Sequence, residues 1–313
     1  MRTILTIFQV LVLSTIACIK QDASVNQAAS NHSPGPAVGN QNEKLRRQIE
    51  QIATTAKGRV GVAAVVLETG ESVSLKENDR FPMQSVYKLP IGMAVVQQID
   101  SGVMSLDREV KVGIEDFVNK GQHSPIRDRR PKGAVLTVNE LLRLMVSESD
   151  GTACDVLLKL IGGPEAVTEF LGLIKVEGVI VANTEKEIGR DWETQYRNWA
   201  SPAGAVALLR ALHERRGLSE SSQALLLKYL RETSTGKKRL KSLLPPEAVV
   251  AHKTGSSGMS KGVSAATNDI GLVSLPDGRH LAIAVFVSDS VAPEAIREEV
   301  IARISRAVWD EFT

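Results

Sequence analysis

The stretch Met83-Gln84-Ser85-Val86-Tyr87-Lys88-Leu89-Pro90 decides how the rest of this 313-residue chain is interpreted. Ser85 and Lys88 have the spacing that places two side chains over one face of a helix, so they can touch. A serine hydroxyl needs a neighbouring base to act as a nucleophile. The following residues, 89–99, are almost all apolar, which predicts a helix buried inside a domain. We expect this helix to start at about Ser85, because Pro90 is tolerated only near a helix start.

Taken alone, Ser-x-x-Lys is a weak signal that arises by chance in many chains. The competing interpretation is a serine that caps the helix and a lysine that lies in solvent. Other residues of the chain must decide between the catalytic interpretation and this structural one.

Composition excludes some classes of function. The chain is 43% hydrophobic and 24% charged, the balance of a soluble globular protein with one large or two ordinary domains. Its net charge of +2 comes from mixed signs. The one basic run, 127–132, contains an acidic residue and no interleaved aromatic residue. We therefore expect no nucleic-acid partner.

Residues 1–17 have the pattern of a secretory signal peptide, with an early arginine, a short apolar run and small residues at the end. Cys18 follows directly, so lipidation of Cys18 stays open beside plain cleavage, because Thr15 stands where lipidation sites usually have leucine. Residues 18–41 have the composition of a flexible tether. We expect a periplasmic or secreted protein, or an outer-membrane-anchored lipoprotein.

Strand patterns at both ends of the chain and helical patterns between them predict an α+β fold. We expect an α/β sandwich lobe, in which residues 42–80 and 236–313 form one antiparallel sheet with helices on its faces. Residues 81–235 are expected to form an all-helical lobe, and the site should lie between the lobes. The expected strands are 60–67, 72–75, 249–253, 262–273 and 281–287; the expected helices include 42–57, 136–146, 153–161, 201–215, 219–231 and 292–312.

Cysteine and histidine placement argues against disulfides and metals. Cys154 lies in an apolar helical pattern and is expected to be a buried free thiol. The histidines show no ligand spacing, so we expect no metal site and no cofactor. These are His123, His213, His252 and His280, with His32 in the tether.

Three further groups change the interpretation of Ser85 and Lys88. Ser149-Asp150-Gly151 lies at a break between two helical patterns, Glu185 lies in an irregular stretch, 182–198, and Lys253-Thr254-Gly255 ends an expected strand. Ser-x-x-Lys, Ser-Asp-Asn and Lys-Thr-Gly together are the signature of class A β-lactamases and penicillin-binding proteins. From residue 42 onward the chain resembles a class A serine β-lactamase, most closely the PER-like extended-spectrum branch. Residues 85–89, 146–150, 195–199 and 251–255 carry the closer match.

The resemblance implies hydrolysis of penicillins and cephalosporins through a serine acyl-enzyme, which confers antibiotic resistance. Ser85 would be the nucleophile with Lys88 beside it, and Ser149 would pass a proton to the leaving ring nitrogen. Glu185 would be the general base that activates the deacylating water. Glu187 is the competing choice, and its side chain is expected to point to solvent.

The resemblance also implies a substrate-binding set. Lys253 and Thr254 would hold the substrate carboxylate, and the backbone N–H groups of Ser85 and Ser256 would form the oxyanion hole. Arg239 could supply an extra cation, and His123 could border the cleft, although a histidine in such a loop is often merely exposed. The expected set is Lys253, Thr254, Gly255, Ser256, Arg239, Asp150 and His123.

Three departures from the family pattern bear on these roles. Gly151 and Gly189 replace asparagines that usually contact the substrate and the water. Asn183 and Asn198 stand where many members have an Arg–Asp ion pair that closes the loop around Glu185.

Two alternatives remain open at this point: a penicillin-binding D,D-peptidase or β-lactam sensor that deacylates slowly, and an inactive periplasmic binding protein on the same fold. For the enzyme we expect a monomer whose partners are a small β-lactam and one catalytic water.

Overall fold

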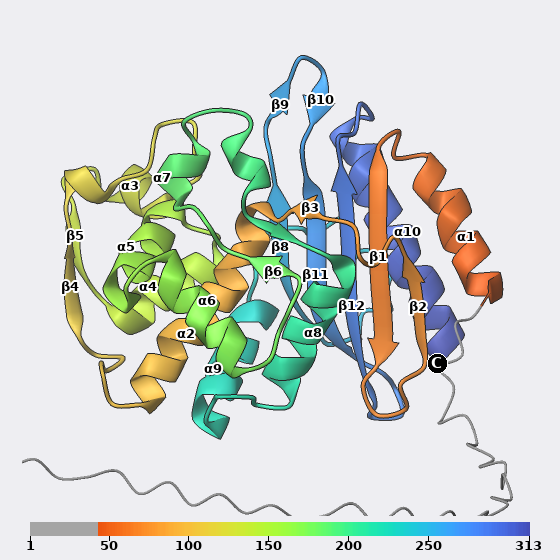
Figure 1. The fold of residues 1–313 in the computed structure, drawn as a ribbon, viewed down its shortest axis with the longest axis horizontal. Helices are drawn as coiled ribbons and strands as arrows, with labels where there is room; N and C mark the ends of the chain where they lie inside the picture. The colour runs from red at the N-terminus through yellow and green to blue at the C-terminus, as the bar shows by residue number, and fades with distance from the viewer. Residues whose placement is uncertain (1–42) are drawn as a thin grey trace, which may run out of the picture. The chain divides into compact units, whose positions relative to one another are not determined.

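The computed structural model describes residues 43–313, and a five-stranded antiparallel sheet of order β2-β1-β12-β11-β8 lies at its centre (Figure 1). The first two strands come from the start of this range and the other three from its end, which confirms the predicted sheet. The strands are β1 (Arg59–Val66), β2 (Ser72–Leu75), β8 (Val250–Ser256), β11 (Thr267–Ser274) and β12 (His280–Ser288).

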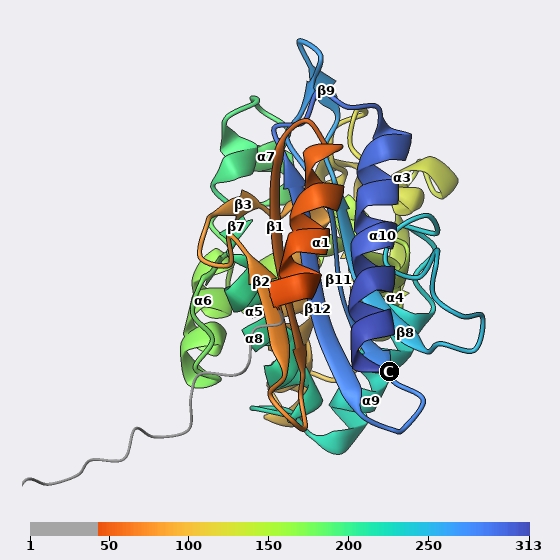
Figure 2. The ribbon, with the colours of Figure 1, turned by 90° about the vertical axis from the view of Figure 1, so that its right-hand side faces the viewer.

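Helices α1 (Glu43–Thr54) and α10 (Glu294–Phe312) pack side by side on one face of the sheet (Figure 2). In α1, Leu45, Ile49 and Ile52 recur at helical spacing and are buried. They join the inward side chains of β1 and β12 in one apolar cluster. Helix α8 (Pro202–His213) packs against β1, β11 and β12, and α9 (Glu220–Arg231) and η1 (Gln84–Tyr87) of the middle region contact β8.

The middle region is mainly helical, and α2 (Lys88–Asp100) runs through its core, as predicted. Residues 88–96 of α2 are all buried. The helix begins at Lys88 rather than Ser85, because a 3₁₀ turn, η1 (Gln84–Tyr87), comes first. The helices around α2 are α3 (Pro125–Arg129), α4 (Val138–Ser147), α5 (Gly151–Ile161), α6 (Pro164–Leu173), α7 (Glu185–Ile188) and α9 (Glu220–Arg231).

The region 81–235 is not all helical, contrary to the prediction. Strands β3, β7 and β6 form a small three-stranded sheet, and β4 and β5 form a separate two-stranded sheet. These strands have two to four residues each, too few for alternation to be recognised. Their bounds are β3 (Phe81–Pro82), β4 (Glu109–Val112), β5 (Ala134–Thr137), β6 (Val179–Ile180) and β7 (Trp199–Ala200); two 3₁₀ turns are η2 (Ile114–Asp116) and η3 (Thr194–Tyr196).

The predicted strand 262–273 is also interrupted. Its start contains β10 (Val263–Ser264), which pairs with the preceding β9 (Met259–Ser260) in a short ribbon, and the main strand begins at Thr267. The division into lobes at residues 80 and 236 stays a prediction. The expected signal peptide, Cys18 and tether lie outside the described residues. Within 43–313, no helix is both long and apolar enough to cross a membrane.

Candidate active site

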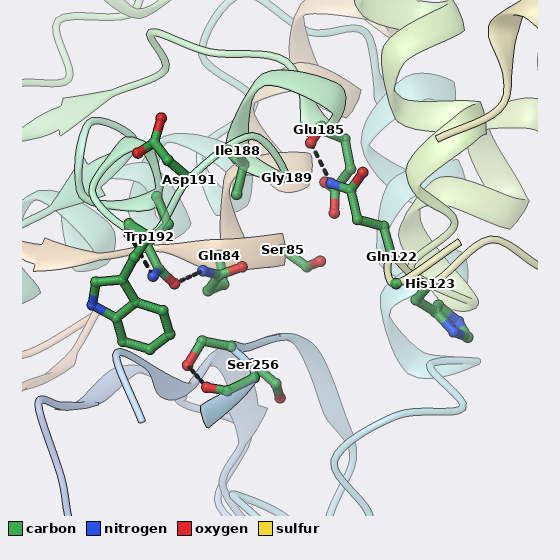
Figure 3. A pocket seen from close by; sticks show the side chains of 14 residues that line it. Gln84, Ser85, Gln122, His123, Glu185, Ile188, Gly189, Asp191, Trp192 and Ser256 are labelled. Atoms are coloured by element: carbon green, nitrogen blue, oxygen red, sulfur yellow. Dashed lines mark hydrogen bonds between the residues drawn. The ribbon is translucent and has the colours of Figure 1, made fainter. Parts of the chain in front are cut away.

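A cavity of about 430 Å³ opens where η1, the loop before α3, the segment that begins with α7, and the end of β8 meet (Figure 3). It collects four of the predicted site residues, Ser85, His123, Glu185 and Ser256, from segments far apart in the sequence. The other charged groups of the predicted site lie buried behind these residues.

Ser85 and Lys88 touch, as their spacing suggested. Lys88 Nζ donates to Ser85 Oγ at 2.8 Å and to the carbonyl oxygen of Ser149 at 3.1 Å. The Lys88 side chain is buried, which excludes the alternative of a solvated lysine. Ser149 has a left-handed φ of 60°, a conformation uncommon outside glycine that often marks functional sites.

Glu185 completes this group from the opposite side. Its carboxylate lies 3.2 Å from Lys88 Nζ and also accepts a hydrogen bond from the Tyr87 hydroxyl. Burial is the largest single influence and lowers the pKa of Lys88, but Glu185 and the other groups around it together outweigh burial, so the pKa is raised overall. Burial raises the pKa of Tyr87 well above its usual value, and the tyrosine remains a hydrogen-bond donor. Lys88 is therefore held as an ammonium ion between a hydroxyl and a carboxylate.

Lys253 is the second buried lysine, and its environment differs. It donates to Ser149 Oγ at 2.9 Å and to the carbonyl of Thr254 at 3.3 Å. Burial, followed by repulsion from the Lys88 ammonium, lowers the pKa of Lys253 to about 7. Ser149 thus lies between the two lysines, and a proton can pass to its hydroxyl from Lys253.

The end of β8 is held close to η1. A Cβ atom at Gly255 would collide with the carbonyl oxygen of Met83, so only glycine fits there. Asn268 of the neighbouring strand donates to the carbonyls of Pro82 (2.8 Å) and Met83 (3.2 Å). These contacts bring Ser256 to the cavity opposite Ser85.

Thr254 and Arg239 are fixed by other polar groups. The hydroxyls of Thr254 and Thr235 lie 2.6 Å apart. The Arg239 guanidinium is buried, pairs with Glu298 at 3.2 Å and donates to Ser256 Oγ at 2.7 Å. Arg239 therefore reaches the cavity through Ser256 rather than by lining it.

Asp150 is the predicted binding residue that the structure turns away from the cavity. Its side chain is fully buried and caps α5 by accepting from the backbone N–H of Ala153 at 2.8 Å. It also accepts from the N–H of Ile126 at 2.6 Å. We correct its predicted role accordingly: Asp150 fixes the α4–α5 connection that carries Ser149. His123, in contrast, lines the cavity, exposed, and its Nε2 donates to the Glu148 carbonyl at 2.9 Å.

An asparagine amide closes the loop around Glu185. Asn198 Oδ1 accepts from the N–H groups of Ala182 (2.7 Å) and Asn183 (2.8 Å), and its Nδ2 donates to the Asn183 carbonyl at 2.9 Å. Neutral hydrogen bonds thus occupy the position where many family members have an Arg–Asp ion pair. The stretch 182–198 is also less irregular than predicted, since α7 and η3 lie within it.

Glu187 does not point freely to solvent, contrary to the expectation. Its carboxylate accepts from the Thr184 N–H at 2.9 Å and closes a capping box at the start of α7. Glu185 faces Lys88, whereas Glu187 faces its own backbone. The geometry therefore favours Glu185 as the group that acts on a substrate.

The sequence analysis missed residues that position Glu185. Asp155 accepts from the backbone N–H groups of Glu185 (2.6 Å) and Lys186 (3.0 Å), and burial raises its pKa to about 6. Gln122 donates to the Glu185 carbonyl (Figure 3). A Cβ atom at Gly189 would lie 2.7 Å from the Gln122 amide carbon, so Gln122 fills the space that this glycine leaves. Only the fold reveals this pairing.

Gly151 has a similar explanation. A Cβ atom there would lie 2.8 Å from Glu185 Cγ and 3.1 Å from the His123 carbonyl oxygen. Glycine at this position, in place of the usual asparagine, therefore leaves room for the observed position of Glu185.

Comparisons with known proteins agree with this geometry. The model of the β-lactamase enzyme family matches residues 44–312. The β-lactamase VEB-1 of Pseudomonas aeruginosa is 39% identical over 87% of this chain and 91% of its own length. The extended-spectrum β-lactamase PER-1 of the same organism is 39% identical over 86% and 87%. A crystal structure of a β-lactamase from Chitinophaga pinensis superposes with a TM-score of 0.84 at 46% identity, covering 86% of this chain and all of that one.

The chain belongs to the β-lactamase enzyme family. This confirms the resemblance to class A enzymes, the predicted fold and the predicted class of hydrolase.

Proposed function

We propose that this chain hydrolyses the β-lactam amide through an acyl-enzyme on Ser85. The observation that carries the proposal is the continuous contact from Ser85 through Lys88 to Glu185, at 2.8 Å and 3.2 Å. Transfer of a proton from Lys88 to Glu185 frees Nζ to accept the Ser85 proton as Oγ attacks the carbonyl carbon. The ring C–N bond then breaks, and the nitrogen takes a proton from Ser149, which Lys253 resupplies.

Deacylation is the reverse transfer with water as the nucleophile. Before water attacks, Glu185 releases to solvent the proton it took from Lys88, and Lys253 regains one, so both groups return to their resting charges. Glu185 then accepts a proton from the water, the hydroxide oxygen attacks the ester carbon, Ser85 Oγ leaves with a proton from Lys88, and Glu185 returns its proton to Lys88. One water is consumed and the enzyme is regenerated. The N–H groups of Ser85 and Ser256 are assigned to the oxyanion, where a donor contributes about 3–4 kcal/mol in other acyl-transfer enzymes.

Lys253 and Thr254 are proposed to hold the substrate carboxylate, with Arg239 fixing the Ser256 hydroxyl beside them. We assign both penicillins and cephalosporins as substrates. The extended-spectrum activity in the name of PER-1 supports the second class, as does the loop closed by Asn198 instead of an ion pair. A β-lactam panel tests this, and turnover of penicillins alone would contradict it.

The alternatives are less well supported. A D,D-peptidase or sensor with the same motifs lacks a glutamate for deacylation, whereas Glu185 here lies directly against Lys88. An inactive binding protein needs neither this carboxylate nor two buried lysines. We also propose export to the periplasm or medium, since class A β-lactamases are typically exported. Lipidation at Cys18 and a monomeric state are separate proposals, tested by intact mass of the membrane fraction and by light scattering.

The deciding experiment is intact-protein and peptide mass spectrometry with a slow β-lactam substrate. We expect one adduct, on the peptide that contains Ser85, and its decay as product accumulates. Ser85→Ala should show neither adduct nor turnover. An adduct on another peptide, or a stable adduct without turnover, would overturn the proposal of hydrolysis at Ser85.

A further inference from the structure

Glu68, His213 and His280 form a cluster outside the active site, and we propose that it binds a transition-metal cation such as Zn²⁺. One donor atom from each residue lies within 4.8 Å of the other two. Two imidazole nitrogens and a carboxylate oxygen suit Zn²⁺, Ni²⁺ or Cu²⁺, whereas Mg²⁺ and Ca²⁺ prefer oxygen ligands alone. The sequence predicted no metal because the histidines lack ligand spacing, and only the fold brings these three residues together.

The three residues come from well-fixed elements. Glu68 follows the end of β1, His280 begins β12, and His213 is the last residue of α8. Strands β1 and β12 are paired in register at this end, and α8 packs against both. Core packing therefore sets the distances between the ligand-bearing backbones.

The separations of the donor atoms are near those of a tetrahedral site. Glu68 Oε1 lies 2.7 Å from His280 Nδ1 and 3.9 Å from His213 Nε2. The two imidazole rings pack with centroids 4.5 Å apart. Zinc bonds of 2.0–2.2 Å place neighbouring ligand atoms roughly 3.4 Å apart in a tetrahedron. Small side-chain rotations, each moving an atom by about 1 Å or less, would reach this geometry.

The surroundings of the cluster are compatible with a cation. The second oxygen of Glu68 accepts from the His280 backbone N–H at 2.8 Å, which orients the carboxylate toward the imidazoles. The nearby Arg210 and Arg216 guanidiniums both pair with Glu214, at 3.5 Å and 2.6 Å. The side chains of His213, His280 and Glu68 are 29%, 37% and 38% exposed, which leaves an entry path and room for water as a fourth ligand.

The cluster and the active site lie at opposite ends of the sheet. Ser256 pairs with Thr267, which pairs with Val287. Val287 pairs with Val60, near the start of β1, whereas Glu68 follows its end (Figure 1). A metal at Glu68 therefore stabilises the junction of α8 with the sheet and takes no part in hydrolysis.

The test is calorimetric titration of the untagged, metal-stripped protein with ZnCl₂ and NiCl₂, together with thermal unfolding. We expect one site per chain and a higher Tm with metal, because a ligand that binds only the folded state stabilises it. His213→Gln and His280→Gln should each weaken binding by at least about 10-fold, since loss of even an outer-shell partner of a metal costs that much. His123→Gln removes an exposed histidine elsewhere and should leave the metal affinity unchanged.

Circular dichroism of each variant establishes that it is folded before titration. Equal affinity in wild type, His213→Gln and His280→Gln would overturn the proposal, as would equal weakening by His123→Gln. Absence of saturable binding to the folded wild-type protein would overturn it as well. Hydrolysis of β-lactams is measured in parallel, and its loss or retention leaves the metal result independent of the proposed function.

Discussion

The floor of the cavity and the loop that covers it are built in different ways. The floor is Ser85 together with Lys88, Ser149 and Lys253 buried behind it, and it comes from the start of a buried helix, a helix junction and a strand of the main sheet. The loop, residues 182–198, is held mainly by backbone N–H groups that donate to a few side-chain oxygens. Core packing therefore fixes the floor, whereas single polar residues fix the loop.

This contrast divides the two half-reactions. Acylation acts on Ser85 through Lys88 of the floor and uses Glu185 only as the acceptor of the lysine proton, a role that solvent can fill more slowly. Deacylation needs Glu185 itself, because it must take the proton of the attacking water. Substitutions in the loop should therefore slow deacylation more than acylation while the global fold persists. Four experiments test this division, and they are ordered from the largest expected effect to the smallest.

Replacing Glu185 by glutamine should have the largest effect. The amide cannot accept a proton from water, so kcat should fall by about 100- to 10,000-fold and acyl-enzyme should accumulate. Paired measurements of kcat and adduct mass under saturating substrate check this. Glu187→Gln is the matched control and should cost far less, since its carboxylate only caps α7. Accumulation of adduct in Glu187→Gln but not in Glu185→Gln would reverse the assignment.

Raising the pH should lower activity through the loss of charge on Lys253. With a pKa of about 7, Lys253 loses its charge as the pH rises further, so kcat/KM should fall about tenfold per unit above that value. The free energy of unfolding should rise from pH 7 to 10, because the unfolded chain keeps the Lys253 proton to higher pH than the folded chain does. Lys253→Arg should move the alkaline limb upward. A limb that stays in place in a folded Lys253→Arg variant would implicate another group.

Replacing Asn198 by alanine should disturb the loop alone. It leaves the N–H groups of Ala182 and Asn183 without their acceptor, at a cost of about 1–3 kcal/mol in free energy of unfolding. Urea denaturation measures this cost, and burst kinetics should show acylation retained with slower deacylation. Asn78→Ala, at an exposed position, is the control. Equal slowing of both steps would show that the floor depends on the loop.

The smallest expected effect is that of Gln122→Ala. It removes one hydrogen bond to the Glu185 carbonyl, worth about 1 kcal/mol, so deacylation should slow roughly fivefold. Gln48→Ala, on the surface of α1, serves as the control. An unchanged deacylation rate in Gln122→Ala would remove Gln122 from the residues that position Glu185.

The same contrast explains what the sequence could predict. The contact of Ser85 with Lys88 could be predicted from their spacing, and Ser149 and Lys253 could be proposed as their neighbours because short motifs at element boundaries carry them. The long periodic helices and the main strands were also predictable, since burial imposes their patterns.

The remaining details depend on contacts between distant segments. No periodic sequence signal marks three of them: the inward turn of Asp150, the capping role of Glu187, and the Gln122 side chain that fills the space beside Gly189. The start of α2 was misplaced because a 3₁₀ turn and a first helical turn share the same local spacing. Short strands such as β3 and β6 form only because the fold supplies a partner.

The glycine at position 255 has a consequence for how this enzyme can evolve. Because the strand backbone meets the Met83 carbonyl there, a side chain at position 255 cannot be used to adjust the spacing between β8 and η1. Variants selected on new antibiotics should therefore accumulate at the rim, where Gly121, Trp192 and Gly258 border the opening. The catalytic residues would stay the same while the substrate specificity changes.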